Sequence, residues 1–148
     1  HTIYTDAGSF SLIDESYNAN PASVRAAIET LAAATPSPCG RRIAILGDMR
    51  ELGANSVAMH AELAEDLVAA KIDLVLTAGE DMARLREALP APLRGAHAAD
   101  AGALVAAALA TVSAGDVVMV KGSLVTGMVR IVEALLERNQ MPRAVNDA

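Results

Sequence analysis

The chain has 148 residues, enough for one domain that buries roughly 68–70% of the surface of its unfolded form. Its residues are 53% hydrophobic but only 2% aromatic, and its formal net charge is −6. Without basic runs or aromatic platforms, this composition argues against a nucleic-acid or acidic-membrane surface.

No apolar stretch approaches the ~20 residues of a membrane span, and no signal peptide opens the chain. The single Cys39 has no partner for an intrachain disulfide, which fits a reducing cytoplasm. The chain begins at His1 within strand-like sequence, so we expect it to be a piece of a longer protein.

Strand-like and helix-like segments alternate along the chain. A hairpin is predicted from residues 1–5 and 9–14, followed by a helix from Pro21 to about Ala34 with Asn20 as its N-cap. Ser56 is predicted to cap a long helix that runs through Val68. The later segments are strands at 42–47, 73–79, 96–100 and 116–122, and helices at 80–89, 101–112 and 126–139.

This alternation predicts an α/β fold, a Rossmann-like three-layer domain with a mostly parallel sheet, helices on both faces and an N-terminal edge hairpin. The domain is expected at residues 1–138, with a frayed tail at 139–148. Ligands of such sheets bind at the carboxyl ends of the strands.

Three of the predicted strands run into polar sequence, namely "ESYNANP", "DMRELG" and "KGS". If these strands are neighbours, their side chains converge on one crevice. The converging residues are Asp14, Asn18, Asn20, Asp48, Lys121 and Ser123. The other strand ends, "LTAGED" and "AHAADA", are expected to carry less chemistry.

Each candidate also has a purely structural interpretation. Asn20 would cap its helix, while Asp14 and Glu15 would be solvated loop acids. Asp48 would either bind backbone amides of its own turn or accept the two hydroxyls of a ribose. A buried ammonium needs a partner, so Lys121 would pair with one of the two loop acids or bind an anionic ligand beside the free amides of "KGS".

Other chemistries find little support in the sequence. The three histidines are scattered without the spacing of a zinc site, and Cys39 has no histidine nearby. The motifs GxGxxG, GxxxxGK[ST] and GxSxG are absent. A nucleotide triphosphate would therefore not be held by a Walker loop of this chain.

The segments "DESYNANPAS", "LGDMRELG" and "VKGS" followed by "GM", together with His60, resemble the C-terminal domain of the Mur ligases over about residues 3–138. Within that family the chain is most similar to the member that joins D-alanyl-D-alanine to UDP-N-acetylmuramoyl-tripeptide. The resemblance implies the last third of a cytoplasmic bacterial enzyme of peptidoglycan synthesis. Such an enzyme uses ATP to activate a carboxylate as an acyl phosphate, and an amine then attacks this intermediate to form an amide. Its preceding domains hold the tripeptide, the triphosphate and Mg²⁺, so this chain alone is expected to be inactive.

The same resemblance assigns residues to the ATP side of the reaction. It places Asn18 and Asn20 beside the adenine and the sugar, and Asp48 at the ribose hydroxyls. It also implies that Asp14 and Tyr17 shape the loop that meets the ATPase domain.

On the amino-substrate side, Lys121 and Ser123 match positions that face the dipeptide and the transferred phosphate, with Lys121 as the catalytic group. The family often has arginine and glutamate where this chain has Leu124 and Val129. Because leucine cannot pair a carboxylate, more of that role is expected to fall on Lys121 and Ser123.

A response-regulator-like receiver domain is the main alternative. Its acidic pair and lysine are mimicked by Asp14, Glu15 and Lys121, with Asp48 as phosphoacceptor. Receivers usually place the phosphoacceptor one strand later, follow the lysine with proline rather than Gly122, and lack the N-terminal hairpin. A passive nucleotide-binding module is a third hypothesis, weakened by the missing phosphate loop.

Overall fold

The computed structural model describes residues 1–140, and residues 141–148, most of the predicted tail, lie outside the described part. The last two described residues contact the first strand. The side chain of Asn139 accepts a hydrogen bond from the Tyr4 N–H at 2.9 Å, and the Gln140 N–H donates to the Tyr4 carbonyl at 2.7 Å.

Strands and helices alternate after the N-terminal hairpin, as predicted. The strands are β1 (Thr2–Thr5), β2 (Gly8–Glu15), β3 (Arg42–Gly47), β4 (Leu74–Ala78), β5 (Arg94–Ala98) and β6 (Val117–Lys121). The α-helices are α1 (Pro21–Ala33), α2 (Ser56–Ala69), α3 (Met82–Ala88), α4 (Ala101–Thr111) and α5 (Val129–Leu136). Short 3₁₀ turns are η1 (Gly53–Asn55), η2 (Ala91–Leu93) and η3 (Leu124–Thr126). None of the helices within residues 1–140 has the length and apolar character needed to cross a bilayer.

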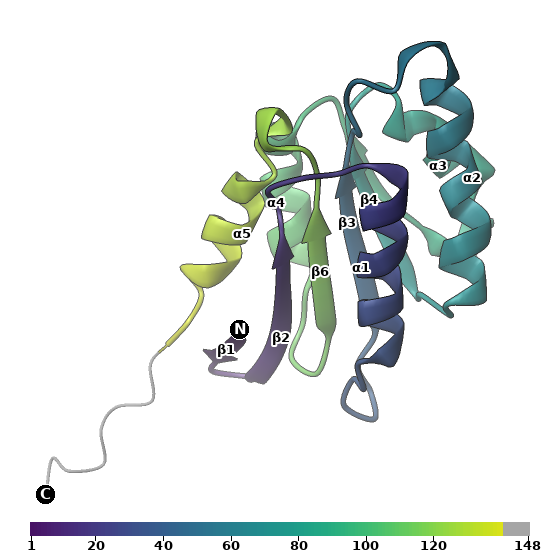
Figure 1. Ribbon diagram of the computed structural model, residues 1–148. Coiled ribbons are helices and arrows are strands. Elements are labelled where there is room, and N and C mark those ends of the chain that lie inside the picture. The colour runs from purple at the N-terminus through teal and green to yellow at the C-terminus, as the bar shows by residue number, and fades with distance from the viewer. Residues whose placement is uncertain (141–148) are drawn as a thin grey trace, which may run out of the picture.

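The six strands form one sheet in the order β1-β2-β6-β3-β4-β5. The edge strand β1 is antiparallel to β2, and every other pair is parallel (Figure 1). The predicted edge hairpin and mostly parallel sheet are confirmed. Because the β-strand order places β6 between β2 and β3, the carboxyl ends of these three strands lie side by side.

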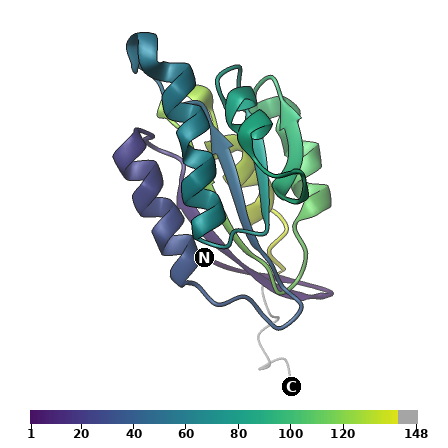
Figure 2. The same ribbon diagram turned by 90° about the vertical axis from the view of Figure 1, so that its right-hand side faces the viewer.

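Helices cover both faces of the sheet, which makes three layers (Figures 1 and 2). One apolar core joins α1, α2 and α3 to the sheet, and the other joins α4 and α5 to the opposite face. On β3, Ala44 and Leu46 face the first core, while Ile43 and Ile45 face the second. This double burial explains why the strand is uniformly apolar rather than alternating.

The start of α1 follows the prediction. Asn20 is its N-cap, with its side chain accepting from the Ser23 N–H at 2.8 Å, while the Ser23 hydroxyl accepts from the Asn20 N–H at 3.0 Å. This reciprocal pair satisfies two amides that the first turn of a helix leaves open.

The start of α2 differs from the prediction. Ser56 is the first helical residue rather than the cap, and the N-cap position belongs to Asn55, which makes no side-chain capping bond. The Ser56 hydroxyl instead donates to the Asp81 carboxylate at 2.7 Å. The Ser56 side chain therefore does not cap its own helix, because its hydroxyl binds a residue 25 positions further along the chain.

The edge strand β5 also begins earlier than predicted, at Arg94 rather than Ala96. Its predicted last residue, Asp100, instead caps α4, accepting a hydrogen bond from the Ala103 N–H at 2.8 Å. Aspartate is among the best N-cap residues, so it ended the strand and started the helix.

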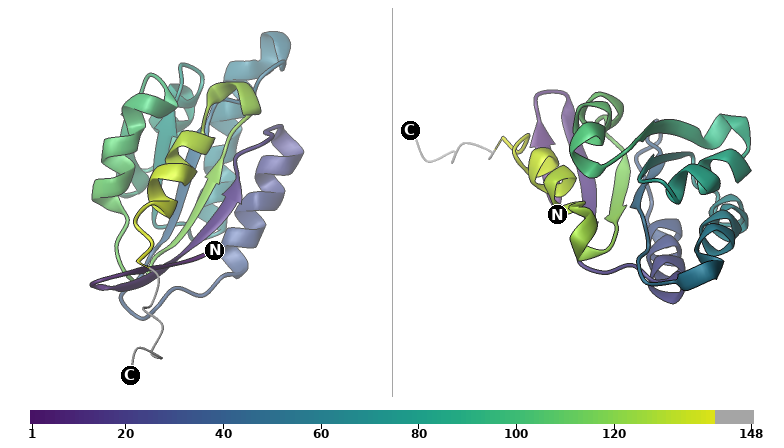
Figure 3. Two further views of the ribbon diagram at one scale, coloured as in Figure 1. Left: turned by 90° about the vertical axis from the view of Figure 1, so that its left-hand side faces the viewer. Right: turned by 90° about the horizontal axis from the view of Figure 1, so that it is seen from above.

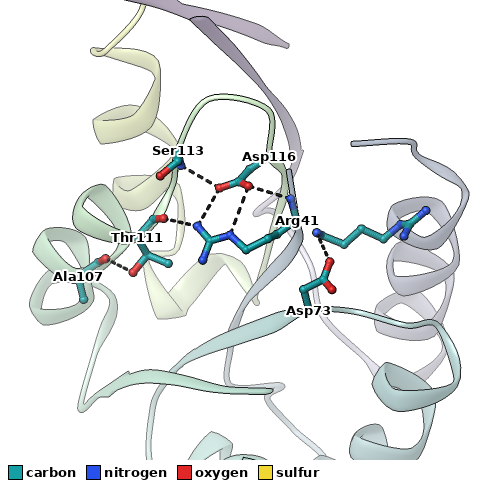
Figure 4. Close-up of polar contacts among 7 residues, drawn as sticks. Arg41, Asp73, Ala107, Thr111, Ser113 and Asp116 are labelled. Carbon is teal, nitrogen blue, oxygen red and sulfur yellow. Dashed lines mark hydrogen bonds and ion pairs between the residues drawn. The ribbon is translucent and has the colours of Figure 1, made fainter. Parts of the chain in front are cut away.

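At the amino ends of the strands, a buried carboxylate ties several segments together (Figure 4). Asp116 accepts hydrogen bonds from the Arg41 backbone N–H at 2.9 Å, the Arg41 guanidinium at 3.1 Å and the Ser113 N–H at 2.8 Å. The guanidinium also donates to the Thr111 carbonyl at 2.7 Å. With its charge paired and its oxygens occupied, Asp116 stabilises the sheet edge opposite the carboxyl ends of the strands.

Candidate functional site

The carboxyl ends of β2, β6 and β3 meet at one edge of the sheet, so the adjacency that the site prediction required is present. The right-hand view of Figure 3 looks down on this edge. The connection from β2 to α1 passes across the end of β6, and the turn after β6 leads into α5 (Figure 1).

Lys121 ends β6 with an almost buried side chain, only 4% exposed. Its ammonium lies 3.7 Å from the carboxylate of Glu15, which is 44% exposed and sits at the paired position on β2. Of the two acids considered from the sequence, the partner is therefore Glu15 and not Asp14. This ion pair leaves donors of the ammonium free among the described contacts, because 3.7 Å is too long for a good hydrogen bond.

The turn after β6 presents an unsatisfied hydroxyl. Ser123 is only 9% exposed, and its Oγ has no hydrogen-bond partner within the described part of the chain. The Thr126 hydroxyl and N–H both bind the Ser123 carbonyl, at 2.6 and 3.0 Å, and so fix the turn. A Cβ at Gly122 would come within 2.4 Å of Met128, which explains the glycine between the two polar residues. A buried hydroxyl without a partner is costly unless a ligand supplies one.

Asp48, directly after β3, binds the neighbouring turn rather than its own. Its carboxylate accepts from the Met82 N–H at 2.8 Å and, more weakly, from the Asp81 N–H at 3.4 Å. It packs against Gly79, whose φ is +111° and where an added Cβ would lie 2.4 Å from the carboxyl carbon. A carboxylate has about four lone-pair positions, so two amides leave capacity for further donors.

Two cavities adjoin Asp48. One, of about 330 Å³, opens toward β4, β5 and the turn after β6, and its lining includes Arg50, Gly79, Asp100 and Thr126. The other, of about 320 Å³, lies along the loop between β3 and α2 and is also lined by Arg50. Asp48 and Glu80 are thus the two acidic residues that line both cavities at the carboxyl ends of the strands.

His60, on α2, is fully buried behind this loop. Its Nε2 accepts a hydrogen bond from the Met49 N–H at 2.9 Å, and its Nδ1 lies 2.6 Å from the Ser56 carbonyl oxygen. The sequence placed this histidine on a helix face and gave it no role. Its i+4 spacing from Ser56 was the only available signal, since the contact with Met49 depends on the loop's path.

The loop between β2 and α1 is held mainly by its own side chains. The Asp14 carboxylate accepts from the Ser16 hydroxyl at 2.6 Å and the Tyr17 hydroxyl at 3.1 Å. The second hydrogen bond, together with the negative charge, raises the pKa of Tyr17 above its ordinary value. Asn18 and Asn20 are exposed on this loop, and no hydrogen bond within residues 1–140 joins either to Asp48.

Two strand ends were expected to carry little chemistry, and the end of β4 differs from this expectation. The β4–α3 turn, from "LTAGED", supplies the amides that hold Asp48, and the residues after β5 line a cavity with it. The signal that sequence reasoning passed over was a glycine just before a helix start, the usual place for free amides.

The carboxylates of a receiver domain would share one site, and these three do not. Asp14 is engaged by its own loop, Glu15 by Lys121, and Asp48 by the turn after β4. Within residues 1–140, no three or more His, Cys, Asp or Glu side chains gather in a way that would hold a metal ion. The receiver alternative therefore finds no support in the geometry.

Comparison with known proteins finds relatives of the same kind by sequence and by structure. UDP-N-acetylmuramoyl-tripeptide–D-alanyl-D-alanine ligase of Escherichia coli (strain K12) is 38% identical over 128 residues, 85% of this chain and 27% of the ligase. MurF from Acinetobacter baumannii superposes with a TM-score of 0.73 at 25% identity, over 93% of this chain and 29% of that one. MurF from Thermotoga maritima, solved in complex with ADP, gives a TM-score of 0.72 at 24% identity over 93% of this chain and 30% of that one.

The chain thus spans between a quarter and a third of the length of these relatives. Residues 2–124 match the family described as Mur ligase, glutamate ligase domain. Since this match covers most of the chain, the chain belongs to the Mur ligase family.

Proposed function

We propose that this chain is the C-terminal domain of an ATP-dependent ligase that joins D-alanyl-D-alanine to UDP-N-acetylmuramoyl-tripeptide in peptidoglycan synthesis. The observation that carries the proposal is the similarity over 85% of the chain to a ligase of that name. The activity would belong to the whole protein, because the chain spans only 27% of that ligase. With ATP as co-substrate, the reaction would take place in the bacterial cytoplasm.

On the nucleotide side, we assign Asp48 to the two ribose hydroxyls. Its free lone pairs and its place between two cavities support this role. Asn18 and Asn20 would face the adenine and sugar from the β2–α1 loop, where both are exposed. The ADP bound to the Thermotoga maritima protein, which shares this fold, is consistent with a nucleotide here.

On the amino-substrate side, we assign Lys121 and Ser123 to the dipeptide carboxylate and the transferred phosphate. The unpartnered Ser123 hydroxyl and the incompletely paired ammonium are donors of the kind that such anions need. Leu124 is 65% exposed and has no polar atom in its side chain, so it cannot share this task.

The proposed reaction has two steps. ATP transfers its γ-phosphoryl group to the terminal carboxylate of the tripeptide, which gives an acyl phosphate and ADP. The free amine of D-alanyl-D-alanine then attacks the acyl carbon, and the tetrahedral intermediate loses a proton and expels inorganic phosphate. The ammonium of Lys121 would neutralise part of the negative charge on the acyl phosphate.

Bound Mg²⁺ would neutralise charge on the phosphates of ATP. The residues described here offer no cluster of three His, Cys, Asp or Glu ligands, so the ion and the triphosphate would be held mainly by the rest of the protein. The part of this chain would be to bind the ribose, orient the dipeptide and exclude water as the domains close.

The proposal is tested with the full-length protein, UDP-N-acetylmuramoyl-tripeptide, ATP and a panel of amino substrates. We expect ADP release that depends on D-alanyl-D-alanine, and a product heavier than the tripeptide precursor by one dehydrated dipeptide. Turnover with a single amino acid but not with the dipeptide would overturn the assignment. Incubation with acetyl phosphate is the control for the receiver hypothesis, and we expect no covalent label on Asp48.

A further inference from the structure

We propose that Asn139 and Gln140 form a strap that closes the outer edge of β1, and that a second copy of this chain pairs with β1 when the strap is released. The strap consists of these two residues, which follow α5. The proposal concerns an edge strand of the sheet and needs no ligand, so it is independent of the proposed function.

Alternate residues of β1 direct their backbone groups away from β2. The His1 carbonyl accepts a hydrogen bond from the Leu12 N–H at 2.8 Å, and the antiparallel pairing continues from there without a register shift. In such a pair, every second residue exchanges its backbone hydrogen bonds with the residue opposite. Thr2 and Tyr4 are the residues in between, so their N–H and C=O groups point to the outer edge of the sheet.

The strap occupies both outward groups of Tyr4. The Asn139 side-chain oxygen accepts from the Tyr4 N–H at 2.9 Å, and the Gln140 N–H donates to the Tyr4 carbonyl at 2.7 Å. The left-hand view of Figure 3 shows the chain running from the end of α5 toward β1. One side chain and one backbone amide thus take the place of the two hydrogen bonds that a neighbouring strand would make here.

β1 itself carries little protection against strand addition. Its sequence, "TIYT", has high β propensity and contains neither charge nor proline, and its register against β2 is regular. The opposite edge strand, β5, carries Arg94 and His97 and has a register shift against β4. The Arg86 guanidinium also binds its Gly95 carbonyl at 3.0 Å. The two edges of the sheet therefore differ, because β5 is protected by charges and an irregular register and β1 by the strap.

The partner that fits the open edge is β1 of a second copy. Two antiparallel β1 strands related by a two-fold axis at Ile3 place Thr2 of each copy opposite Tyr4 of the other. Both residues direct their N–H and C=O groups to this edge, so each opposed pair exchanges two hydrogen bonds. A β-branched residue opposite an aromatic one is a favourable cross-strand pair, and Tyr4 is 46% exposed. Because the contact is its own complement, it closes as a dimer.

The experiment uses the full-length protein and two measurements, namely sedimentation velocity for self-association and hydrogen exchange of the Tyr4 amide at low protein concentration. The strap-free variant combines Asn139→Ala with Gln140→Pro, which removes the acceptor and the donor. We expect exchange at Tyr4 to be about ten-fold faster and self-association to be about ten-fold stronger, because two neutral hydrogen bonds no longer compete with the second copy. Asn139→Asp keeps an acceptor for the Tyr4 N–H, so it should behave like the natural protein.

Two further variants serve as controls. Asn55→Ala is the matched control, because it removes an exposed asparagine side chain that makes no capping hydrogen bond, and it should change neither measurement. Thr2→Lys in the strap-free variant places a charge on the open edge of β1. It should restore the monomer, while exchange at Tyr4 stays fast.

Three outcomes would overturn the proposal. Unchanged exchange at Tyr4 in the strap-free variant would mean that the strap does not close the edge. Fast exchange without stronger self-association would mean that no second copy binds there. Self-association that persists with Thr2→Lys would mean that another surface makes the contact. If the strap-free variant does not fold, Asn139→Ala alone decides by the same two measurements. Dipeptide ligation enters neither of them, so the proposed function and this proposal fail separately.

Discussion

At the end of β3, the Asp48 carboxylate combines an observed structural contact with a proposed role in ligand binding. It joins the β3 and β4 strand ends through the Met82 amide, and it has lone pairs left for a ligand. Lys121 likewise combines an observed ion pair with a proposed binding role, since Glu15 balances its charge at 3.7 Å without using all of its donors. At the residue scale, therefore, structural and ligand-binding roles are compatible, and kinetics must be measured together with stability.

Asp48→Asn in the full-length enzyme is expected to raise the KM for ATP by about ten-fold or more. A hydrogen bond to a charged group contributes roughly 1.5–3 kcal/mol, and asparagine keeps the shape of the side chain while losing the charge. The KM for the dipeptide should be affected much less. An unchanged dependence on ATP in a normally folded variant would mean that Asp48 only braces the β4–α3 turn.

Ser123→Ala is expected to raise the KM for the dipeptide by about ten-fold, with little effect on folding, because its hydroxyl has no partner among the described residues. Lys121→Ala should raise it further and also lower kcat. Melting temperature decides the role of the lysine. If Lys121→Ala lowers the Tm strongly and leaves the dipeptide kinetics unaltered, its task is to pair with Glu15 across the two strands.

At the scale of single elements, the start of α1 holds one asparagine that caps the helix and another that does not, and both are proposed to bind the nucleotide. Asn20 completes a capping box with Ser23, whereas Asn18, two residues earlier, is exposed and makes no hydrogen bond within the described chain. Asn20 therefore has a structural role as a helix cap and Asn18 does not, although both are proposed to bind the nucleotide.

This difference gives a paired prediction. Asn20→Ala should lower the stability by about 1 kcal/mol through loss of the cap, whereas Asn18→Ala should leave the Tm unchanged. Both should raise the KM for ATP. Asn20→Ser keeps a capping oxygen but removes the amide, so it should restore the Tm without restoring nucleotide binding. If Asn20→Ser binds ATP normally, Asn20 is a cap and nothing more.

At the scale of the whole molecule, a paired charge network lies at the amino ends of the strands, and the proposed binding residues lie at the carboxyl ends. The buried Asp116 and its partner Arg41 join the amino ends of the strands (Figure 4). The unsatisfied Ser123 hydroxyl and the partly paired Lys121 lie at the carboxyl ends. Two apolar cores, one on each face, support both edges.

Because both faces of the sheet are covered within residues 1–140, the isolated chain should fold by itself and unfold in one cooperative transition. It should neither hydrolyse ATP nor form the dipeptide amide, since it contains no Walker loop. Circular dichroism during thermal unfolding and an assay for phosphate release check the two parts. Ligase turnover by this chain alone would contradict the division of labour proposed here.

The sequence by itself determined the order of the elements and three of the strand ends that carry polar residues, although it passed over the end of β4. These features are encoded over a few residues, in the apolar runs of β3 and β6 and the Asn20 cap before Pro21. The family, too, could be recognised from short motifs at three strand ends, and the match over residues 2–124 confirms it. The binding roles of Asn18, Lys121 and Ser123 stay predictions.

Only the tertiary structure decided which groups meet. It chose Glu15 over Asp14 as the partner of Lys121, because β2 and β6 pair in the register that sets Glu15 opposite it. In the folded chain the Ser56 hydroxyl binds Asp81, 25 residues away, instead of capping α2. The Met82 amide likewise binds Asp48, 34 residues away. Such contacts depend on how β3, β4 and α2 pack against one another. No local pattern of residues encodes that packing, so these contacts became visible only in the folded chain.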